Sequence, residues 1–289
     1  DRNPLLVRHH LAPANLHWCS DDSLQMIFET ARSNGANVHM HLLETKRQAA
    51  FARAHYGRSA VEHLAALGCL GPELTIGHGN WACDSDLDLI ADCGCTVCHN
   101  ASSGLRLGSG IAPVNAMRKR GIPVALGIDQ SNLADDRDML IEMKLVWALH
   151  RGTDLFNQRP DAAAVLQMAT EHGARSAGYG GIVGRLEPGL RADIVLLKKD
   201  RLARPYLHPD TPLSEAVLHR AMKDAVHQVF VEGHRLVDDG RVISIDRDGV
   251  MQEIAARLAE PESAGEREAK RMIESLMPFL EKVHRDNPL

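Results

Sequence analysis

Val38-His39-Met40-His41-Leu42-Leu43-Glu44 is the stretch around which the rest of the chain can be organised. Val38 to Leu42 predicts a short buried strand, and residues i and i+2 of a strand share a face. His39 and His41 are therefore expected to project together, although His39 is explained equally well as a core side chain. Glu44 follows the predicted strand, where a loop would carry its carboxylate over a site. The stretch predicts a strand that ends in groups able to bind a metal and to move a proton.

Three later segments end in the same kind of residue. Each is a short apolar run of strand type that finishes in a histidine or a carboxylate: Thr75-Ile76-Gly77-His78, Cys95-Thr96-Val97-Cys98-His99 and Val124-Ala125-Leu126-Gly127-Ile128-Asp129. Polar residues at the carboxyl ends of successive parallel strands are typical of an active site on a (β/α)8 barrel. A carboxylate directly after an apolar run, such as Asp129, is costly to bury unless a cation pairs with it.

Predicted strands and helices alternate over the first 180 residues. Strands are expected near 5–11, 38–42, 75–78, 95–99 and 123–128. Helical patterns separate and follow them, near 20–34, 46–67, from 84 onward, and near 112–120, 138–150 and 161–177. Such alternation predicts a parallel sheet wrapped by helices.

The pattern changes after Gly180. Strands are expected at 194–197, 226–232, 235–237 and 242–245, with Glu232-Gly233-His234 and Asp238-Asp239-Gly240 as hairpin turns. From Gly249 onward the chain is charged and helical, and Pro261 and Gly265 divide this part into two helices. The sequence thus predicts three parts, at 1–180, 181–247 and 248–289.

The composition bears on the partners, the location and the chemistry to be expected. The 289-residue chain has 33 Lys and Arg against 38 Asp and Glu, a net charge of −5, which gives no reason to expect nucleic acid or an anionic membrane as partner. No apolar run approaches the ~20 residues that span a bilayer. Six cysteines, mostly inside apparent strands or helices, do not suggest a disulfide framework, so a reducing cytoplasm is the expected location. The 16 histidines favour metal or proton-transfer chemistry.

The chain opens at Asp1, without methionine, and leads at once into a predicted strand. We expect that residues precede Asp1 in the parent protein.

Cys95-x-x-Cys98-His99 matches the attachment signature of c-type haem, and Cys93 adds a third thiol. We reject a haem or thiolate-metal site, because Cys95 and Cys98 would point to opposite faces of a strand. A tetrahedral zinc site would also need a second ligand pair, and no further Cys-x-x-Cys follows. These cysteines are predicted to act as small hydrophobic side chains.

Together the motifs resemble those of the amidohydrolase superfamily. The segments are His41-Leu-Leu-Glu44, then His78, then the run from Asn100 to Pro113, then Gly127-Ile-Asp129. More narrowly, they resemble the branch of aromatic-ring deaminases and triazine chlorohydrolases, which includes guanine, cytosine and adenosylhomocysteine deaminases. The later stretches 184–195 and 229–233 are similar to that branch as well.

The resemblance implies an α/β fold, a (β/α)8 TIM-type barrel that is incomplete here because it lacks the first strands. Residues 1–180 would supply about strands 4 to 8 with their helices, 181–247 part of a small β-sandwich, and 248–289 the C-terminal helices. The helical tail and the βα loops are compatible with a homodimer.

The resemblance also assigns roles. His41 would be a metal ligand on the fifth barrel strand and Glu44 the proton shuttle. His78, on the sixth strand, would hydrogen bond to the substrate or to water on the metal. Asp129, after the eighth strand, would be both a metal ligand and the general base.

The implied cofactor is one divalent metal, zinc first and iron as the alternative, which supplies hydroxide at neutral pH. The implied reaction is hydrolytic deamination of a small N-heterocyclic aromatic amine, such as a purine or pteridine, at an amino-bearing ring carbon. Trp81, His99 and Asn100, which lie at predicted strand ends, join His78 as candidate substrate-binding residues.

Two departures from the family pattern matter. The family's first strand carries a His-x-His pair of ligands, and no such strand precedes His41; alone, His41 and Asp129 are expected to hold a metal poorly. Asn100-Ala-Ser-Ser-Gly104 also differs from the usual Asn-Pro-x-Ser-Asn, so that a side chain expected to shape the pocket is missing.

Two alternatives stay open. The first is a hydrolase of the same fold with another leaving group, such as an s-triazine chlorohydrolase, which releases chloride in place of ammonia. The second is a catalytically incompetent fragment or pseudoenzyme, which metal analysis would reveal.

Overall fold

The computed structural model describes residues 6–130, 137–152 and 159–286. The contacts divide the chain into two units, Asp1–Gly240 and Arg241–Leu289, and each is described by itself. The predicted three-part division at 180/181 and 247/248 stays a prediction.

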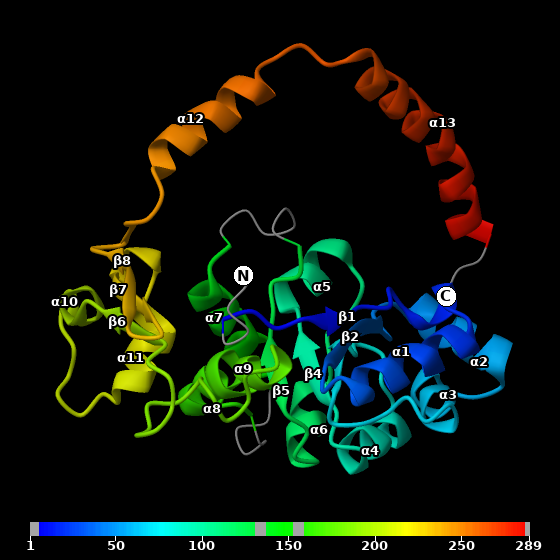
Figure 1. The fold of residues 1–289 in the computed structure, drawn as a ribbon, viewed down its shortest axis with the longest axis horizontal. Coiled ribbons are helices and arrows are strands. Elements are labelled where there is room, and N and C mark those ends of the chain that lie inside the picture. Colours follow the sequence, from blue (N-terminus) through cyan, green and yellow to red (C-terminus); the bar gives the residue numbers. More distant parts are fainter. Residues whose placement is uncertain (1–5, 131–136, 153–158, 287–289) are drawn as a thin grey trace. The chain divides into compact units, whose positions relative to one another are not determined.

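A parallel sheet of five strands lies at the centre of the first unit (Figure 1). Its order is β1-β2-β3-β4-β5, and each neighbouring pair is parallel. The strands are β1 (His10–Leu11), β2 (Asn37–Leu42), β3 (Leu74–His78), β4 (Thr96–His99) and β5 (Val124–Leu126). The predicted parallel sheet is confirmed, and its sequential order brings the strand ends named above to one edge.

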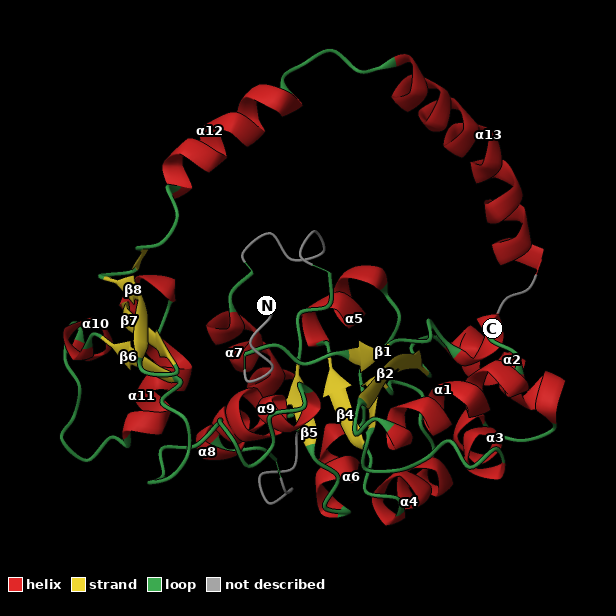
Figure 2. Ribbon diagram, viewed as in Figure 1, coloured by secondary structure: helices red, strands yellow, loops and turns green. Residues whose placement is uncertain are grey.

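Helices connect these strands, as predicted (Figure 2). Those that follow the strands up to β5 are η1 (Leu16–Trp18), α1 (Asp21–Ser33), α2 (Lys46–Tyr56), α3 (Ala60–Ala66), α4 (Asp84–Asp92), α5 (Ala101–Leu107) and α6 (Val114–Lys119). Beyond β5 come α7 (Met139–Leu149), α8 (Ala162–Gln167), the π-helical turn η2 (Met168–His172) and α9 (Gly173–Ser176).

One predicted helix is two in the structure. The helix expected over 46–67 breaks at Gly57, whose φ of 68° ends α2 in the left-handed region that glycine tolerates. Ser59 then begins α3 with a capping box, in which its hydroxyl accepts from the Glu62 amide and the Glu62 carboxylate accepts from the Ser59 amide. Helix α5 was not predicted.

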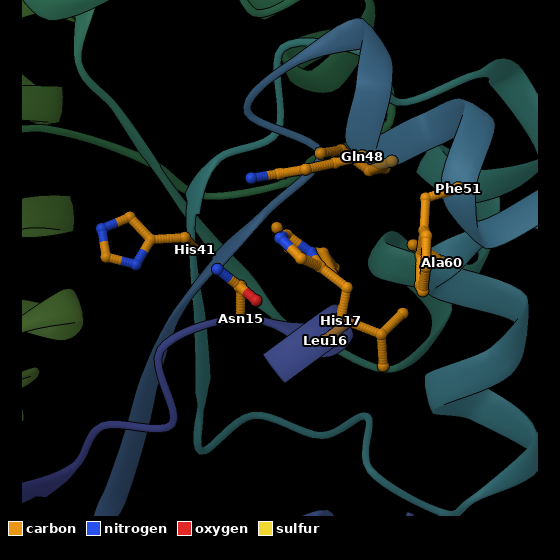
Figure 3. Close-up of a pocket in the computed structure, with 9 residues that line it drawn as sticks. Asn15, Leu16, His17, His41, Gln48, Phe51 and Ala60 are labelled. Atoms are coloured by element: carbon orange, nitrogen blue, oxygen red, sulfur yellow. The ribbon is translucent and has the colours of Figure 1, made fainter. Parts of the chain in front are cut away.

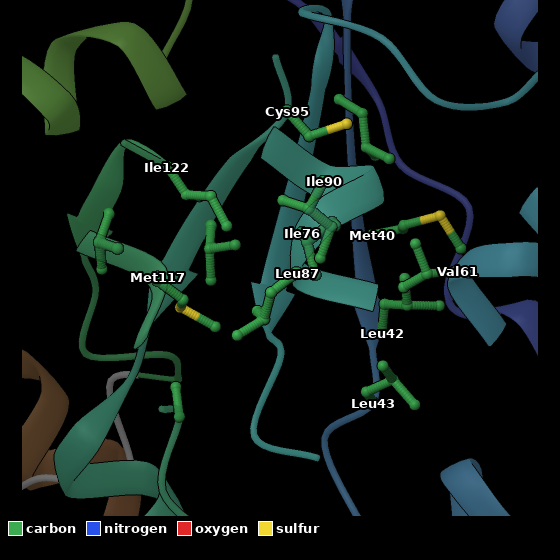
Figure 4. Close-up of a cluster of buried hydrophobic side chains, with 14 of the residues drawn as sticks. Met40, Leu42, Leu43, Val61, Ile76, Leu87, Ile90, Cys95, Met117 and Ile122 are labelled. Carbon is green, nitrogen blue, oxygen red and sulfur yellow. The ribbon is translucent and has the colours of Figure 1, made fainter. Parts of the chain in front are cut away.

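The hydrophobic core lies between the sheet and one layer of helices (Figure 4). Met40 and Leu42 of β2 and Ile76 of β3 are almost fully buried there, against side chains such as Leu87 and Met117 of the helices. In β2 the exposed fraction alternates, because every second side chain points away from the core.

On β2 the other face of the sheet is polar and less buried, whereas the residues of β3, β4 and β5 are buried. His39 and His41 lie between buried neighbours of β2 and are partly buried and exposed respectively, which confirms that they share a face. Gly77 and Cys98 occupy the same register row as His41 on β3 and β4. This polar face carries the metal-competent histidine.

An antiparallel sheet follows, with β6 (Ile194–Leu197), β7 (Val226–Val231) and β8 (His234–Asp238). The predicted hairpin between β7 and β8 is confirmed: Glu232 and Gly233 have φ of 52° and 76°, the two positive values of a tight type I′ turn. Three short helices complete this part: α10 (Lys199–Ala203), α11 (Leu213–Arg220) and η3 (Lys223–Ala225).

The second unit holds β9 (Arg241–Val242) and two helices, α12 (Arg247–Leu258) and α13 (Ala264–Asp286). The break between the helices, which was predicted from Pro261 and Gly265, falls at residues 259–263. Among the described helices, none combines the length and apolar character of a membrane-spanning segment.

Candidate active site

The carboxyl ends of β2, β3 and β5 bring three predicted residues together. His41 lies in β2, His78 is the last residue of β3, and Asp129 follows β5. Each offers one ligand atom, and these atoms lie within 4.8 Å of one another. Imidazole nitrogens and a carboxylate oxygen are donors typical of a zinc or iron site, so the donor set fits a first-row divalent metal.

A hydrogen bond holds one ring nitrogen of His41 and leaves the other available to a ligand. Its Nδ1 lies 2.7 Å from the backbone oxygen of Ala14, in the segment between β1 and η1. Because a carbonyl only accepts, Nδ1 carries the hydrogen and Nε2 keeps its lone pair. A carbonyl that fixes the tautomer of a histidine in this way is a common second partner of metal-ligating imidazoles.

His78 lies between two carboxylates. Its Nε2 is 4.0 Å from Glu44 Oε2 and 4.0 Å from Asp129 Oδ2, and its ring stacks on that of His41 with 5.5 Å between centroids. Burial lowers the pKa of His78 and outweighs the two carboxylates, which act to raise it. The side chain is therefore neutral at pH 7 and can donate or accept one hydrogen bond at Nε2.

Glu44 is fixed through its backbone. Its amide donates to Gln48 Oε1 at 2.7 Å, and its carbonyl accepts from Asn80 Nδ2 at 3.0 Å. Gln48 also lines a small pocket beside His41 (Figure 3). These two contacts leave the Glu44 carboxylate free to face His78, and neither Gln48 nor Asn80 was singled out from the sequence.

The first turn of α5 supplies two further contacts. Asn100 Nδ2 lies 3.4 Å from His78 Nδ1, and Ser103 donates to Asp129 Oδ2 at 2.6 Å. The structure gives a packing reason for Gly104, where the family pattern has a larger residue. A Cβ at this position would overlap the carbonyl oxygen of Gly110, so glycine is needed for close packing.

The backbone is strained at the site. Leu43, His78 and Asp129 have φ of 52°, 76° and 60°, values that L-residues other than glycine rarely adopt. Such residues persist only where surrounding contacts hold them, and they cluster at functional sites.

Trp81 lies at the edge of the site and is 40% exposed. Its indole Nε1 donates to the carbonyl of Ser109 at 2.7 Å, and the Lys46 ammonium lies 6.0 Å from the ring centroid. The fixed, half-exposed ring offers an apolar surface on which a heterocycle could stack.

The structure does not bring His99 to this group. His99 is two residues beyond Val97 on β4 and so faces the helix side, where it is fully buried. Its Nε2 lies 3.1 Å from His150 Nε2, just after α7. The predicted substrate-binding role of His99 stays a prediction that this burial does not support.

The buried histidine pair predicts a pH dependence of stability. Burial lowers the pKa of His99 to about 3 and that of His150 to about 4. In the unfolded chain both would bind protons near pH ~6.5, so protons favour unfolding. We expect the free energy of unfolding to be highest above pH ~6.5 and to fall as the pH is lowered toward ~4.

Urea unfolding at several pH values between about 7 and about 5 measures this slope. His150→Gln should reduce it, whereas His234→Gln, at an exposed position of β8, should leave it unchanged. Equal slopes for wild type and His150→Gln would contradict the assignment.

The cysteines carry neutral thiols where they are buried. All six are free. Burial raises the pKa of Cys95 to about 11 and that of Cys98 to about 12. Since the thiolate is the metal-binding form, these values favour the prediction that both act as small hydrophobic side chains.

Comparisons with known proteins agree with this geometry. The sequence profile of the amidohydrolase family matches residues 2–236. A 5'-deoxyadenosine deaminase of Methanosarcina mazei is 34% identical over 254 residues, which cover 88% of this chain and 57% of that protein. A 5-methylthioadenosine/S-adenosylhomocysteine deaminase of Acetivibrio thermocellus is 31% identical, covering 87% and 58% respectively. The chain therefore spans somewhat over half the length of the curated relatives it matches.

Solved structures share the fold. An adenosine deaminase of Xanthomonas campestris with bound zinc superimposes with a TM-score of 0.82 at 25% identity, over 88% of this chain and 57% of that one. An atrazine chlorohydrolase of Arthrobacter aurescens complexed with zinc gives a TM-score of 0.79 at 24% identity, over 85% and 54%. The two sheets described above thus have the arrangement of known amidohydrolase structures.

Proposed function

The chain belongs to the amidohydrolase family, and from this premise we propose that the protein is a metal-dependent deaminase of an adenine-containing nucleoside. The observation that carries the proposal is the approach of His41, His78 and Asp129, whose ligand atoms lie within 4.8 Å, with the Glu44 carboxylate beside them. A metal site flanked by a spare carboxylate suits hydrolysis with proton transfer to the leaving group or ring.

The substrate class comes from the relatives. Those at 31–34% identity are named for 5'-deoxyadenosine, 5-methylthioadenosine and S-adenosylhomocysteine, which share an adenine ring with an exocyclic amine. The proposal narrows the N-heterocyclic amine expected from the sequence to this ring. Trp81 would stack on the ring, and Asn100 would act through His78.

Zinc is the proposed metal, with iron as the alternative. His41 would bind through its free Nε2 and Asp129 through a carboxylate oxygen. A divalent cation there would lower the pKa of a bound water toward ~7.

The side chains of this chain would divide the proton transfers. If Asn100 donates to His78 Nδ1, the neutral ring carries its hydrogen on Nε2, which faces both carboxylates and would hydrogen bond to the attacking oxygen. Asp129 would accept the proton of that oxygen. Glu44 would carry the other proton of the attacking water to a ring nitrogen, and Asp129 would pass the proton it has taken to the amino group, which leaves as ammonia.

Finer structural expectations also belong to the proposal. They are closure of the parallel sheet into a (β/α)8 barrel in the protein at its natural length, a β-sandwich around β6 to β8, a homodimer, and a cytoplasmic location. The less buried, polar face of β2 that carries His39 and His41 supports closure, since in a barrel it would face the interior.

A substrate panel tests the function in the protein at its natural length. We expect ammonia release from 5'-deoxyadenosine, 5'-methylthioadenosine or S-adenosylhomocysteine, with about one equivalent of zinc or iron per chain. Chloride release from a chlorotriazine would favour the chlorohydrolase alternative instead. A metal-free protein without activity on the panel would contradict the proposal and favour a pseudoenzyme.

A further inference from the structure

We propose that Ser103 is a positioning residue for Asp129, an inference that rests on the proposed function. Ser103 touches neither the proposed substrate nor the metal. It acts on the reaction by holding the Asp129 carboxylate, through Oδ2, in the orientation in which this group faces His78.

The contact is short and buried. Ser103 Oγ donates to Asp129 Oδ2 at 2.6 Å, and Ser103 has no exposed surface. A hydroxyl that donates to a carboxylate makes a charge-assisted hydrogen bond, roughly twice as strong as one between neutral groups. Among the described residues, Ser103 is the side chain whose hydrogen bond to the Asp129 carboxylate the structure shows.

Asp129 needs such a contact. It lies beyond the end of β5, and its φ of 60° is unfavourable for a residue with a Cβ. A carboxylate on a strained backbone outside regular structure has several rotamers available, only some of which point toward His78. A fixed donor selects one of them, at Oδ2, which lies 4.0 Å from His78 Nε2.

Ser103 is itself held firmly. It lies in the first turn of α5, where the Gly104 amide donates to the Asn100 carbonyl and the Ser102 amide donates to Glu142 Oε1 at 3.1 Å. Glu142 belongs to α7 and is buried, and the close contact of Gly104 with the Gly110 carbonyl fixes the other side of the helix. The hydroxyl therefore comes from a rigid element, as a positioning group requires.

The preceding residue, Ser102, provides a matched control. Ser102 lies in the same helical turn, but its Oγ is a buried atom without a hydrogen-bond partner. Ser102→Ala removes a hydroxyl of equal size from α5 without touching Asp129. Any loss specific to Ser103→Ala must then come from the bond to the carboxylate.

The experiment compares Ser103→Ala, Ser103→Cys and Ser102→Ala in the protein at its natural length. Cysteine keeps a side chain of similar shape, but its thiol is a weak hydrogen-bond donor. If the alanine variant folds poorly, the cysteine variant therefore shows the effect of losing the hydrogen bond without the effect of losing side-chain volume. The measurements are kcat and KM, the Kd for Zn²⁺ of the metal-free protein, and the visible spectrum of the Co²⁺ form.

For Ser103→Ala and Ser103→Cys we expect a ~10–100-fold loss in kcat or in metal affinity, a KM close to wild type and an altered Co²⁺ spectrum. Ser102→Ala should match the wild type in all three. Ser103 variants that bind metal and turn over as the wild type does, or losses equal in the Ser102 and Ser103 variants, would overturn the inference.

The two proposals fail in different ways. A wild-type protein that binds metal but deaminates no nucleoside would overturn the function, while Kd and the Co²⁺ spectrum would still test Ser103. A wild-type protein without metal affinity would overturn both.

Discussion

Asp129→Ala is expected to reduce deamination by on the order of 10³-fold or more and to weaken metal binding at the same time. The substitution removes a proposed ligand and the proposed general base together, and it leaves the buried Ser103 hydroxyl without its acceptor. Initial rates with the best nucleoside substrate and the metal content of the purified variant measure both losses.

Two further variants sharpen this test. Asp129→Asn keeps the shape of the side chain and an oxygen that can accept from Ser103, but it lacks the charge, so it should be almost as inactive as the alanine variant. Asp92→Ala removes an exposed carboxylate at the end of α4 and should have wild-type activity. An active Asp129→Ala variant would contradict the mechanism.

Glu44→Gln is the second large effect. We expect kcat to fall by roughly 10²–10⁴-fold, because an amide of the same shape cannot carry a proton between the attacking water and the ring. Metal content should stay at the wild-type level, since Glu44 is not one of the three clustered donors. KM should change little, which assigns the loss to the chemical step.

The contrast between the two variants is informative. Loss of metal together with activity is expected for Asp129→Ala, and loss of activity alone for Glu44→Gln. Glu187→Gln, an exposed carboxylate in a turn, is the control for the second variant. If Glu44→Gln retained wild-type kcat, the proton shuttle would have to be another residue.

The sequence was sufficient for the parallel sheet and for the residues that meet at its edge. Period-two alternation marked β2, and parallel strands necessarily bring their carboxyl ends together, which is why His41, His78 and Asp129 could be named before their distances were known. The hairpin turn was predictable because Glu232-Gly233 separates two runs of strand type and Gly233 suits positive φ.

The contacts that hold the site residues in place could not be predicted from the sequence. The partner of His41 Nδ1 is a backbone oxygen of Ala14, and any residue type could supply it. Ser103 and Gln48 act through contacts that depend on how α5 and α2 are placed, and short-range patterns do not contain that information.

The predictions were wrong for two helical regions, for local reasons. Gly57 and the capping box that Ser59 begins are both visible in the sequence. One helix over 46–67 was nevertheless predicted, because the residues on both sides of the break fit a helical pattern. Helix α5 contains serines and a glycine, which are weak helix formers, so its formation depends on packing against α7.

The left-handed backbone at His78 and Asp129 has a consequence for engineering. Glycine at either position would relieve roughly 1 kcal/mol of unfavourable conformation, but it would also remove the buried ring of His78 or the acceptor of the buried Ser103 hydroxyl. Each such exchange would delete an imidazole or a carboxylate on which turnover is proposed to depend. The strained backbone at these two strand ends is therefore expected to persist in every active variant.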